Sequence, residues 1–165
     1  MNNKQPIVKI RLSKFNKFLE LISFCALALL WIMTIYLFIH LPTVIPIHFH
    51  LKGNISRSES KNIIWLFPAI ATLLIFGLTL LNKYPHLFNY PVNITEQNAE
   101  RQYRMATQLI RVIKCSIVLL FIFCVVEIET AAKNKSLPYK GWEIPVILAL
   151  FFLPVTVYLY SSFKK

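Results

Sequence analysis

The sequence predicts an all-α fold: an integral membrane bundle of four transmembrane helices, with a small extracellular hairpin-like cap between helices 1 and 2. Two observations predict it. Hydrophobic residues make up 56% of the 165 residues and charged residues only 15%, which is more apolar surface than a soluble domain of this size buries. Three runs, 21–39, 63–81 and 144–163, contain no charged residue, and each approaches the ~20 residues that cross a hydrocarbon core.

The four spans are placed at about 19–40, 62–82, 109–130 and 143–163, within a single multi-pass domain that covers residues 1–165. The third span needs an argument, because its uncharged centre, 115–126, gives only ~18 Å of helix at ~1.5 Å per residue. A full span requires Arg111 and Lys114 to extend to one membrane interface and Glu127 to lie at the other.

The distribution of basic residues predicts the orientation. Of the 18 lysines and arginines, ten lie before span one, between spans two and three, or after span four, and Arg111 and Lys114 at the start of span three bring this side to twelve. By the positive-inside rule, both termini are therefore cytoplasmic, and we expect the bacterial cytoplasmic membrane. The formal net charge of +11 then indicates attraction to anionic lipid headgroups. No soluble basic domain is present, so direct nucleic-acid binding is not expected.

The outer loop, 41–61, is polar and rich in proline. Apolar and polar residues alternate from Ile45 onward, which predicts a half-buried strand. Gly53 and Asn54 form a plausible two-residue turn that leads back through Ile55–Arg57. His48 and His50 would stand ~6.6 Å apart on one face of the strand. Two ligands do not make a metal site, so they are weak candidates, and no metal or cofactor is predicted.

The cytoplasmic segment before span three predicts an amphipathic helix, 95–114, that is continuous with the span. Asn93 or Thr95 offers an N-cap. Helical spacing predicts two stripes: an apolar one of Ala99, Tyr103, Ala106, Ile110 and Ile113, and a polar one of Arg101, Arg104, Gln108 and Arg111. The polar stripe is expected either to pack on lipid headgroups or to dock a cytoplasmic partner.

Two segments resemble a known family. The spacing of Leu41, Pro42, Ile45, Pro46, His48, Phe49, Gly53 and Lys61 is similar to the signature of domain of unknown function 1648. The segment from Phe88 to Arg104, which includes Asn89, Tyr90 and Pro91, is similar to the cytoplasmic segment that comes after that signature in stand-alone members. The resemblance implies a membrane domain related to the SdpI toxin-immunity proteins, which protect bacteria from a secreted peptide and can hold a transcriptional repressor at the membrane.

These observations favour a binding, receptor or immunity-type protein of the cell envelope, without catalytic activity. The motifs of common hydrolases, metalloproteases and phosphate-binding loops do not occur. The partners expected are the bilayer with its anionic headgroups and either a secreted peptide outside or a cytoplasmic regulator inside, and a homo-oligomer is a further option. The alternative function is a small oligomeric transporter or channel subunit. The outer ligand-binding candidates are Pro42, Pro46, His48, Phe49, His50, Gly53 and Lys61. The cytoplasmic partner or lipid face comprises Asn89, Tyr90, Pro91, Arg101, Tyr103, Arg104 and Arg111.

Overall fold

The computed structural model describes residues 5–49, 55–134 and 141–164. Four long helices dominate it. They are α1 (Lys14–His40), α2 (Leu66–Leu81), α3 (Ala99–Asn134) and α4 (Glu143–Phe163). The shorter elements are strands β1 (Val44–Phe49) and β2 (Ile55–Ser60) and the 3-10 turns η1 (Lys61–Trp65) and η2 (Pro85–Leu87).

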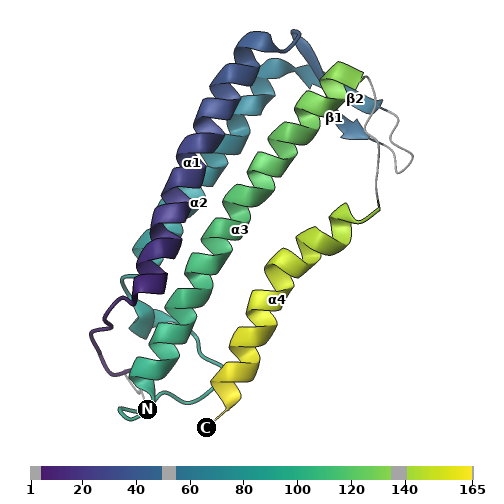
Figure 1. The fold of residues 1–165 in the computed structure, drawn as a ribbon. Coiled ribbons are helices and arrows are strands. Elements are labelled where there is room, and N and C mark those ends of the chain that lie inside the picture. The colour runs from purple at the N-terminus through teal and green to yellow at the C-terminus, as the bar shows by residue number, and fades with distance from the viewer. Residues whose placement is uncertain (1–4, 50–54, 135–140, 165) are drawn as a thin grey trace.

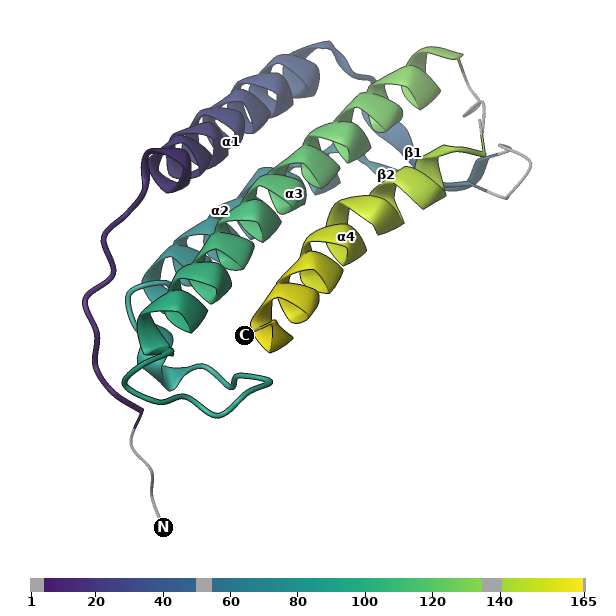
Figure 2. The same ribbon diagram turned by 60° about the horizontal axis from the view of Figure 1, so that its bottom comes forward.

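The helices run side by side along one long axis, with α3 at the centre (Figure 1). It contacts all three other helices, whereas α4 packs mainly on α3. The first and last described residues lie together at one end of the bundle, which we call the termini end. The hairpin formed by β1 and β2 lies at the opposite end, the hairpin end (Figures 1 and 2).

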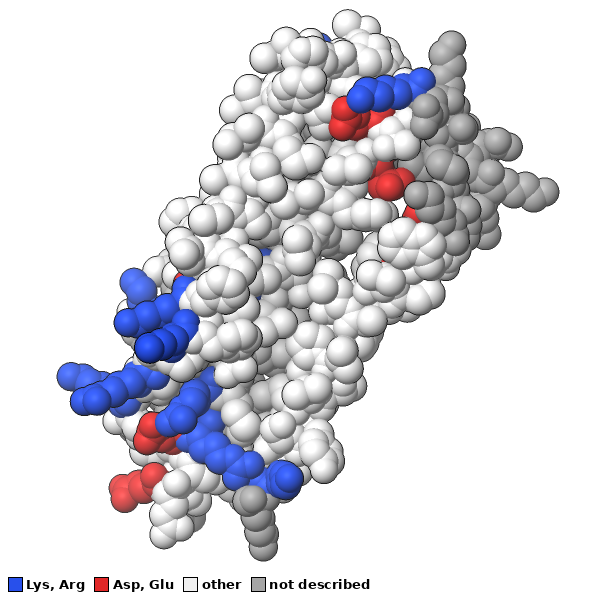
Figure 3. Space-filling model, viewed as in Figure 1, with Lys and Arg blue, Asp and Glu red and all other residues white. Residues whose placement is uncertain are grey.

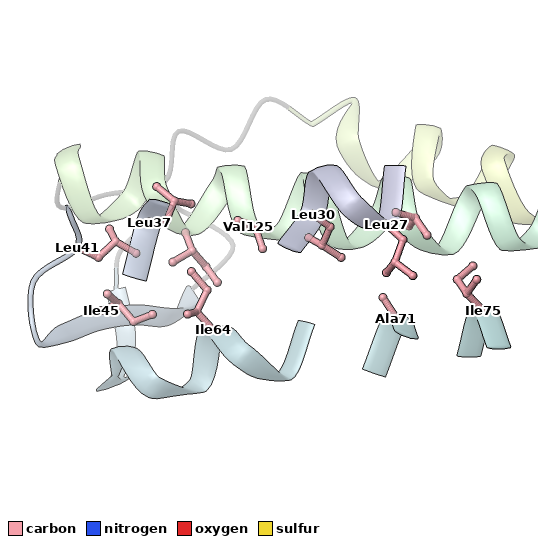
Figure 4. Packing of buried hydrophobic residues seen from close by; sticks show 11 residues of the cluster. Leu27, Leu30, Leu37, Leu41, Ile45, Ile64, Ala71, Ile75 and Val125 are labelled. Atoms are coloured by element: carbon pink, nitrogen blue, oxygen red, sulfur yellow. The ribbon is translucent and has the colours of Figure 1, made fainter. Parts of the chain in front are cut away.

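The core is a narrow seam between α1, α2 and α3 rather than a thick interior. Its apolar members extend from Leu27 and Ile75 to Leu41 and Ile45 at the hairpin end (Figure 4). There Ile45 of β1 and Ile64 of η1 are fully buried against Leu37 and Leu41. Farther along the seam, Leu27 and Leu30 of α1 meet Ala71 and Ile75 of α2 and Val118 and Val125 of α3.

The hairpin is antiparallel, with Ile45 opposite Glu59 and His48 opposite Arg57. Its register shifts on both sides of His48, so the regular alternation predicted from Ile45 onward is interrupted. Such bulges are expected next to Pro46, which has no N–H for the ladder. The return strand is longer than the predicted Ile55–Arg57, since β2 continues to Ser60.

Lys61 joins the hairpin to α1. Its Nζ donates hydrogen bonds to the carbonyl oxygens of Phe38 (2.8 Å) and Leu41 (3.3 Å), and it lies 4.8 Å from the centre of the Phe38 ring. The last carbonyls of a helix have no partner within the helix and carry the negative end of its dipole. A lysine placed there therefore stabilises the end of α1 and holds the start of η1 against it.

Helix α3 begins close to the predicted position. The Thr95 side chain accepts a hydrogen bond from the Asn98 backbone, and the Asn98 side chain accepts one from the Thr95 backbone (2.8 Å). This reciprocal pair satisfies donors that would otherwise be free at the first turn. From Ala99 the helix continues for 36 residues, about 54 Å at ~1.5 Å per residue. The amphipathic segment and the third span are thus one helix.

The outer surface carries apolar side chains along most of the bundle and charged side chains at its ends. Basic groups gather at the termini end, and a broad uncharged band separates them from the hairpin end (Figure 3). Within the described residues, four helices are long and apolar enough to cross a membrane: Lys14–His40, Lys61–Leu81, Ala99–Lys133 and Glu143–Phe163. The predicted fold class, a four-helix membrane-type bundle with a small hairpin, is confirmed.

Candidate binding site

The buried seam changes from apolar to polar toward the termini end. On α1, seam positions recur at alternating spacings of four and three residues, as in a coiled coil. From the hairpin end these positions are Leu37, Thr34, Leu30, Leu27, Ser23, Glu20 and Asn16. On the same seam, α2 contributes Ala71, Ile75 and Thr79, and Asn82 follows directly after its end. Helix α3 contributes Val125, Val118, Lys114, Arg111 and Thr107. All three helices therefore place polar side chains at one level.

An ion cluster of Glu20, Arg111 and Lys114 forms at this level. Lys114 Nζ donates hydrogen bonds to Glu20 Oε2 and to Thr79 Oγ1, the latter at 2.9 Å. Arg111 Nε lies 3.0 Å from Glu20 Oε1, although its N–H is not aligned for a hydrogen bond, and Arg111 Nη1 donates to the Thr107 carbonyl. The ion cluster therefore ties α1, α2 and α3 together through side chains.

Burial gives this cluster a large cost in solvation free energy. The Lys114 side chain has no exposed surface, and those of Arg111 and Glu20 are 6% and 22% exposed. Buried cations lose the stabilisation that water provides and persist only when a carboxylate and hydrogen bonds replace it. Glu20 supplies that carboxylate for both cations, so the cluster depends on this one side chain.

The structure corrects one part of the prediction for span three, in which Arg111 and Lys114 extend outward from the bundle to the membrane interface. Both side chains turn into the bundle instead, where each contacts the Glu20 carboxylate. Arg111 also does not share an exposed stripe with Arg101 and Arg104, which are both exposed. It continues the buried row of Tyr103 and Thr107 instead, at four-residue spacing along α3.

A cavity of about 720 Å³ opens beside the ion cluster. Glu20, Thr79, Thr107 and Arg111 line its inner part, toward the seam. Its other walls are the segment after α2, Asn82–His86, and the N-terminal arm, which we define as residues 5–13 and of which Ile7, Val8, Lys9, Ile10 and Leu12 contribute. A cavity of this size with apolar walls and a few polar groups has the general form of a ligand site.

Asn82 is the least satisfied polar side chain in the wall of this cavity. Both its amide nitrogen and its amide oxygen are shielded from the surface, and neither has a hydrogen-bond partner among the described residues. Buried polar atoms almost always have partners, so the unpaired Asn82 amide is an exception within this wall. The sequence did not single out Asn82 or Glu20, because each stands alone in its segment.

The N-terminal arm is held against the start of α3. The Tyr103 hydroxyl donates a hydrogen bond to the Pro6 carbonyl (2.9 Å), and the Gln5 side chain donates one to the Phe88 carbonyl (3.0 Å). Tyr90 packs on the Tyr103 ring, with 5.4 Å between centroids, and donates to the Pro85 carbonyl. Burial, followed by the nearby tyrosines, raises the pKa of Tyr90 above its ordinary value, so its hydroxyl keeps its proton.

The predicted cytoplasmic face is divided between internal contacts and exposed groups. Tyr103 is fully buried, and Arg101 donates to the carbonyls of Ser161 (2.9 Å) and Lys164 at the end of α4. Arg104 forms an exposed ion pair with Glu100 at 2.5 Å. Asn89 and Pro91 are exposed. The structure therefore does not bring these residues together as one continuous surface.

The outer candidates fall only partly within the described residues. Pro42 is exposed, Pro46, His48 and Phe49 belong to β1, and Lys61 holds the end of α1. His50 and Gly53 lie outside the described residues. Among the residues that the structure does describe, no three His, Cys, Asp or Glu side chains are placed to hold a metal ion.

Fold and site together define a small protein of the multi-pass membrane type, with a strand hairpin at one end and a polar cavity at the other. Residues 25–72 match the family described as Domain of unknown function (DUF1648). This stretch covers most of α1, the hairpin and the start of α2, and it confirms the resemblance predicted from Leu41–Lys61.

A relative with a similar sequence carries no assigned activity. An uncharacterized protein from Archaeoglobus fulgidus is 31% identical over 102 residues, which is 55% of this chain and 56% of the relative. The chain thus spans little more than half the length of that curated relative. No solved structure matches the chain.

Proposed function

We propose that this chain is a non-catalytic binding protein of the cytoplasmic membrane, which recognises a ligand at the hairpin and transmits binding to the termini end. One observation carries the proposal: α3 is a single uninterrupted helix that contacts β1 near one end and η2 near the other. Through Tyr103 it also holds the N-terminal arm. A rigid helix that touches both regions is a physical route by which a change at one end shifts the other.

The orientation in this proposal follows from charge. The basic groups gather at the termini end, which favours that end on the cytoplasmic side of a bacterial membrane. The hairpin would then face outward, where a secreted peptide could reach it. An immunity-type role, in which binding at the hairpin protects the cell from such a peptide, is the narrower form of the proposal.

A second candidate, a small oligomeric transporter or channel subunit, draws support from a different observation. The ion cluster places three ionisable side chains inside the bundle, and intramembrane charged groups often belong to transport pathways. The cluster lies near the ends of the apolar segments, since Thr79 is only two residues from the end of α2. This position favours a site at the membrane boundary over a pathway through its centre.

Photocrosslinking in living cells tests the proposed function. A photoreactive amino acid replaces Val44 in β1 or Arg104 in α3, because both side chains are exposed, whereas the buried Tyr103 would be a poor probe position. Leu73, which is 74% exposed in the middle of α2, is the matched control that faces the lipid.

A binding protein should give a crosslink at Val44 to a defined secreted peptide, or at Arg104 to a defined soluble protein, that the Leu73 probe does not give. The captured molecule, identified by mass spectrometry, should also bind the purified chain. Crosslinks only to lipid and to other copies of the chain from all three positions would contradict the proposal and favour the oligomeric transporter.

A further inference from the structure

We propose that the cavity at the termini end binds the phosphate headgroup of an anionic membrane lipid. The proposal rests on the geometry of the cavity and does not depend on what the hairpin recognises. It also goes beyond a general attraction of the basic chain to a charged bilayer, because it names one site with defined walls. Three features carry it: depth, charge and the mixture of polar and apolar walls.

The depth of the cavity matches that of lipid headgroups. The apolar part of α2 ends at Leu81, and the cavity is lined by the residues after it, from Asn82 to His86. Leu80 and Leu81 themselves are 57% and 45% exposed, which suits side chains that face acyl chains. A molecule in the cavity would therefore sit where the hydrocarbon region gives way to headgroups.

The charge of the cavity favours an anion. Its walls carry the cations Lys9, Lys83 and Arg111 and one carboxylate, Glu20. Glu20 would repel a phosphate, but it is already paired with two cations, Arg111 and the fully buried Lys114. The surroundings of the cavity thus keep an excess of positive charge. Basic pockets between membrane helices at this depth are a recognised arrangement for lipid phosphates.

The polar and apolar walls fit the two parts of a lipid. On the polar wall, the exposed Lys83 supplies a cation for a phosphate oxygen, and it follows Asn82, whose shielded amide has no partner among the described residues. On the opposite wall the N-terminal arm presents Ile7 and Leu12, which are 81% and 46% exposed. A soluble phosphate compound would gain nothing from these apolar side chains, whereas a lipid would cover them.

Native mass spectrometry of the purified full-length chain tests this site. The protein is titrated with phosphatidylglycerol, with phosphatidylcholine, and with soluble glycerol phosphate as a competitor. The double variant Asn82→Leu/Lys83→Gln removes the unpaired amide and a rim charge without touching the ion cluster. Lys17→Gln is the matched control, because Lys17 is exposed near the same end but does not line the cavity.

We expect one phosphatidylglycerol molecule to bind tightly to each chain. The affinity of the chain for this lipid should be about tenfold higher than its affinity for phosphatidylcholine. The double variant should lose most of this preference, while Lys17→Gln keeps it. If the double variant fails to fold, Lys9→Gln and Lys83→Gln replace it, since both side chains are exposed and their neutralisation leaves the core intact.

Three results would overturn the proposal. Equal affinity for the two lipids would show that the chain does not recognise the anionic headgroup. An unchanged preference in the cavity variants would place the lipid elsewhere on the chain. Displacement of phosphatidylglycerol by glycerol phosphate at equal concentration would show that the cavity takes free phosphate compounds, so that the apolar walls play no part in recognition.

Discussion

At the scale of single residues, Glu20 has the largest expected effect. It is the carboxylate that both Arg111 and Lys114 contact in the interior. Removing one partner of a buried ionic group leaves charges that neither water nor protein stabilises. The cost of losing Glu20 should therefore exceed the cost of losing any exposed acidic side chain on the same bundle.

We predict that Glu20→Gln lowers the free energy of unfolding by about 3 kcal/mol, because two cations lose their counter-charge. Glu100→Gln is the control: its ion pair with Arg104 is more than half exposed, and such pairs contribute at most about 1 kcal/mol. Thermal unfolding of the detergent-solubilised variants measures both. Similar losses for the two variants would show that the ion cluster does not stabilise the bundle.

The ion cluster also shows why this site could not be predicted from local sequence patterns. Glu20 and Lys114 are 94 residues apart, and nothing local indicates that they meet. Helical spacing groups Arg111 with Arg101 and Arg104 in one polar stripe, but only the latter two are exposed. One pattern in the sequence does indicate the buried row of α3. It is the spacing of four, four, three and four residues between Tyr103, Thr107, Arg111, Lys114 and Val118.

At the scale of elements, more could be predicted. The helices follow from long uncharged runs, and strand β1 of the hairpin from the alternation that begins at Ile45. The continuous α3 followed from the cap near Thr95 and from helical spacing. What local patterns could not show was the N-terminal arm, because its contacts are with distant segments: the Gln5 side chain donates to the Phe88 carbonyl, and the Tyr103 hydroxyl donates to the Pro6 carbonyl.

We predict that Tyr103→Phe loosens the N-terminal arm without disturbing α3. The change removes one hydrogen bond to the Pro6 carbonyl, worth about 1 kcal/mol, and keeps the buried ring. Trypsin cleavage at Lys9 and Arg11 should then be about fivefold faster in detergent solution. Tyr84→Phe is the control, since that side chain is 52% exposed.

An unchanged cleavage rate in Tyr103→Phe would show that the hydroxyl does not hold the arm. Faster cleavage throughout the chain would indicate general unfolding instead of local release. The result also bears on the cavity, because the arm forms one of its walls. A variant with a loosened arm should hold its lipid less tightly than the unmodified chain.

At the scale of the whole molecule, the bundle has two different ends. The hairpin end closes over an apolar core with Ile45 and Ile64, and the termini end contains the ion cluster and the cavity. Helix α4 enlarges the apolar outer surface but contributes little to the core, since Glu143 and Ser162 are its only buried residues among those described. The proposed function depends on this difference between the two ends, and it therefore requires that the bundle has a fixed orientation in the membrane.

Cysteine accessibility tests that orientation most directly. In a background in which serine replaces Cys25, Cys115 and Cys124, single cysteines replace the exposed Pro42 near the hairpin and the exposed Asn93 near the termini end. A cysteine at Leu73, in the apolar band, is the control and should react poorly in all conditions.

In intact cells, a membrane-impermeant maleimide should label Pro42→Cys at once and Asn93→Cys only after the membrane is permeabilised. This result would place the hairpin outside and the ion cluster and cavity inside. Labelling of Asn93→Cys in intact cells, with Pro42→Cys protected, would reverse the orientation and contradict the account of a ligand recognised at the outer hairpin.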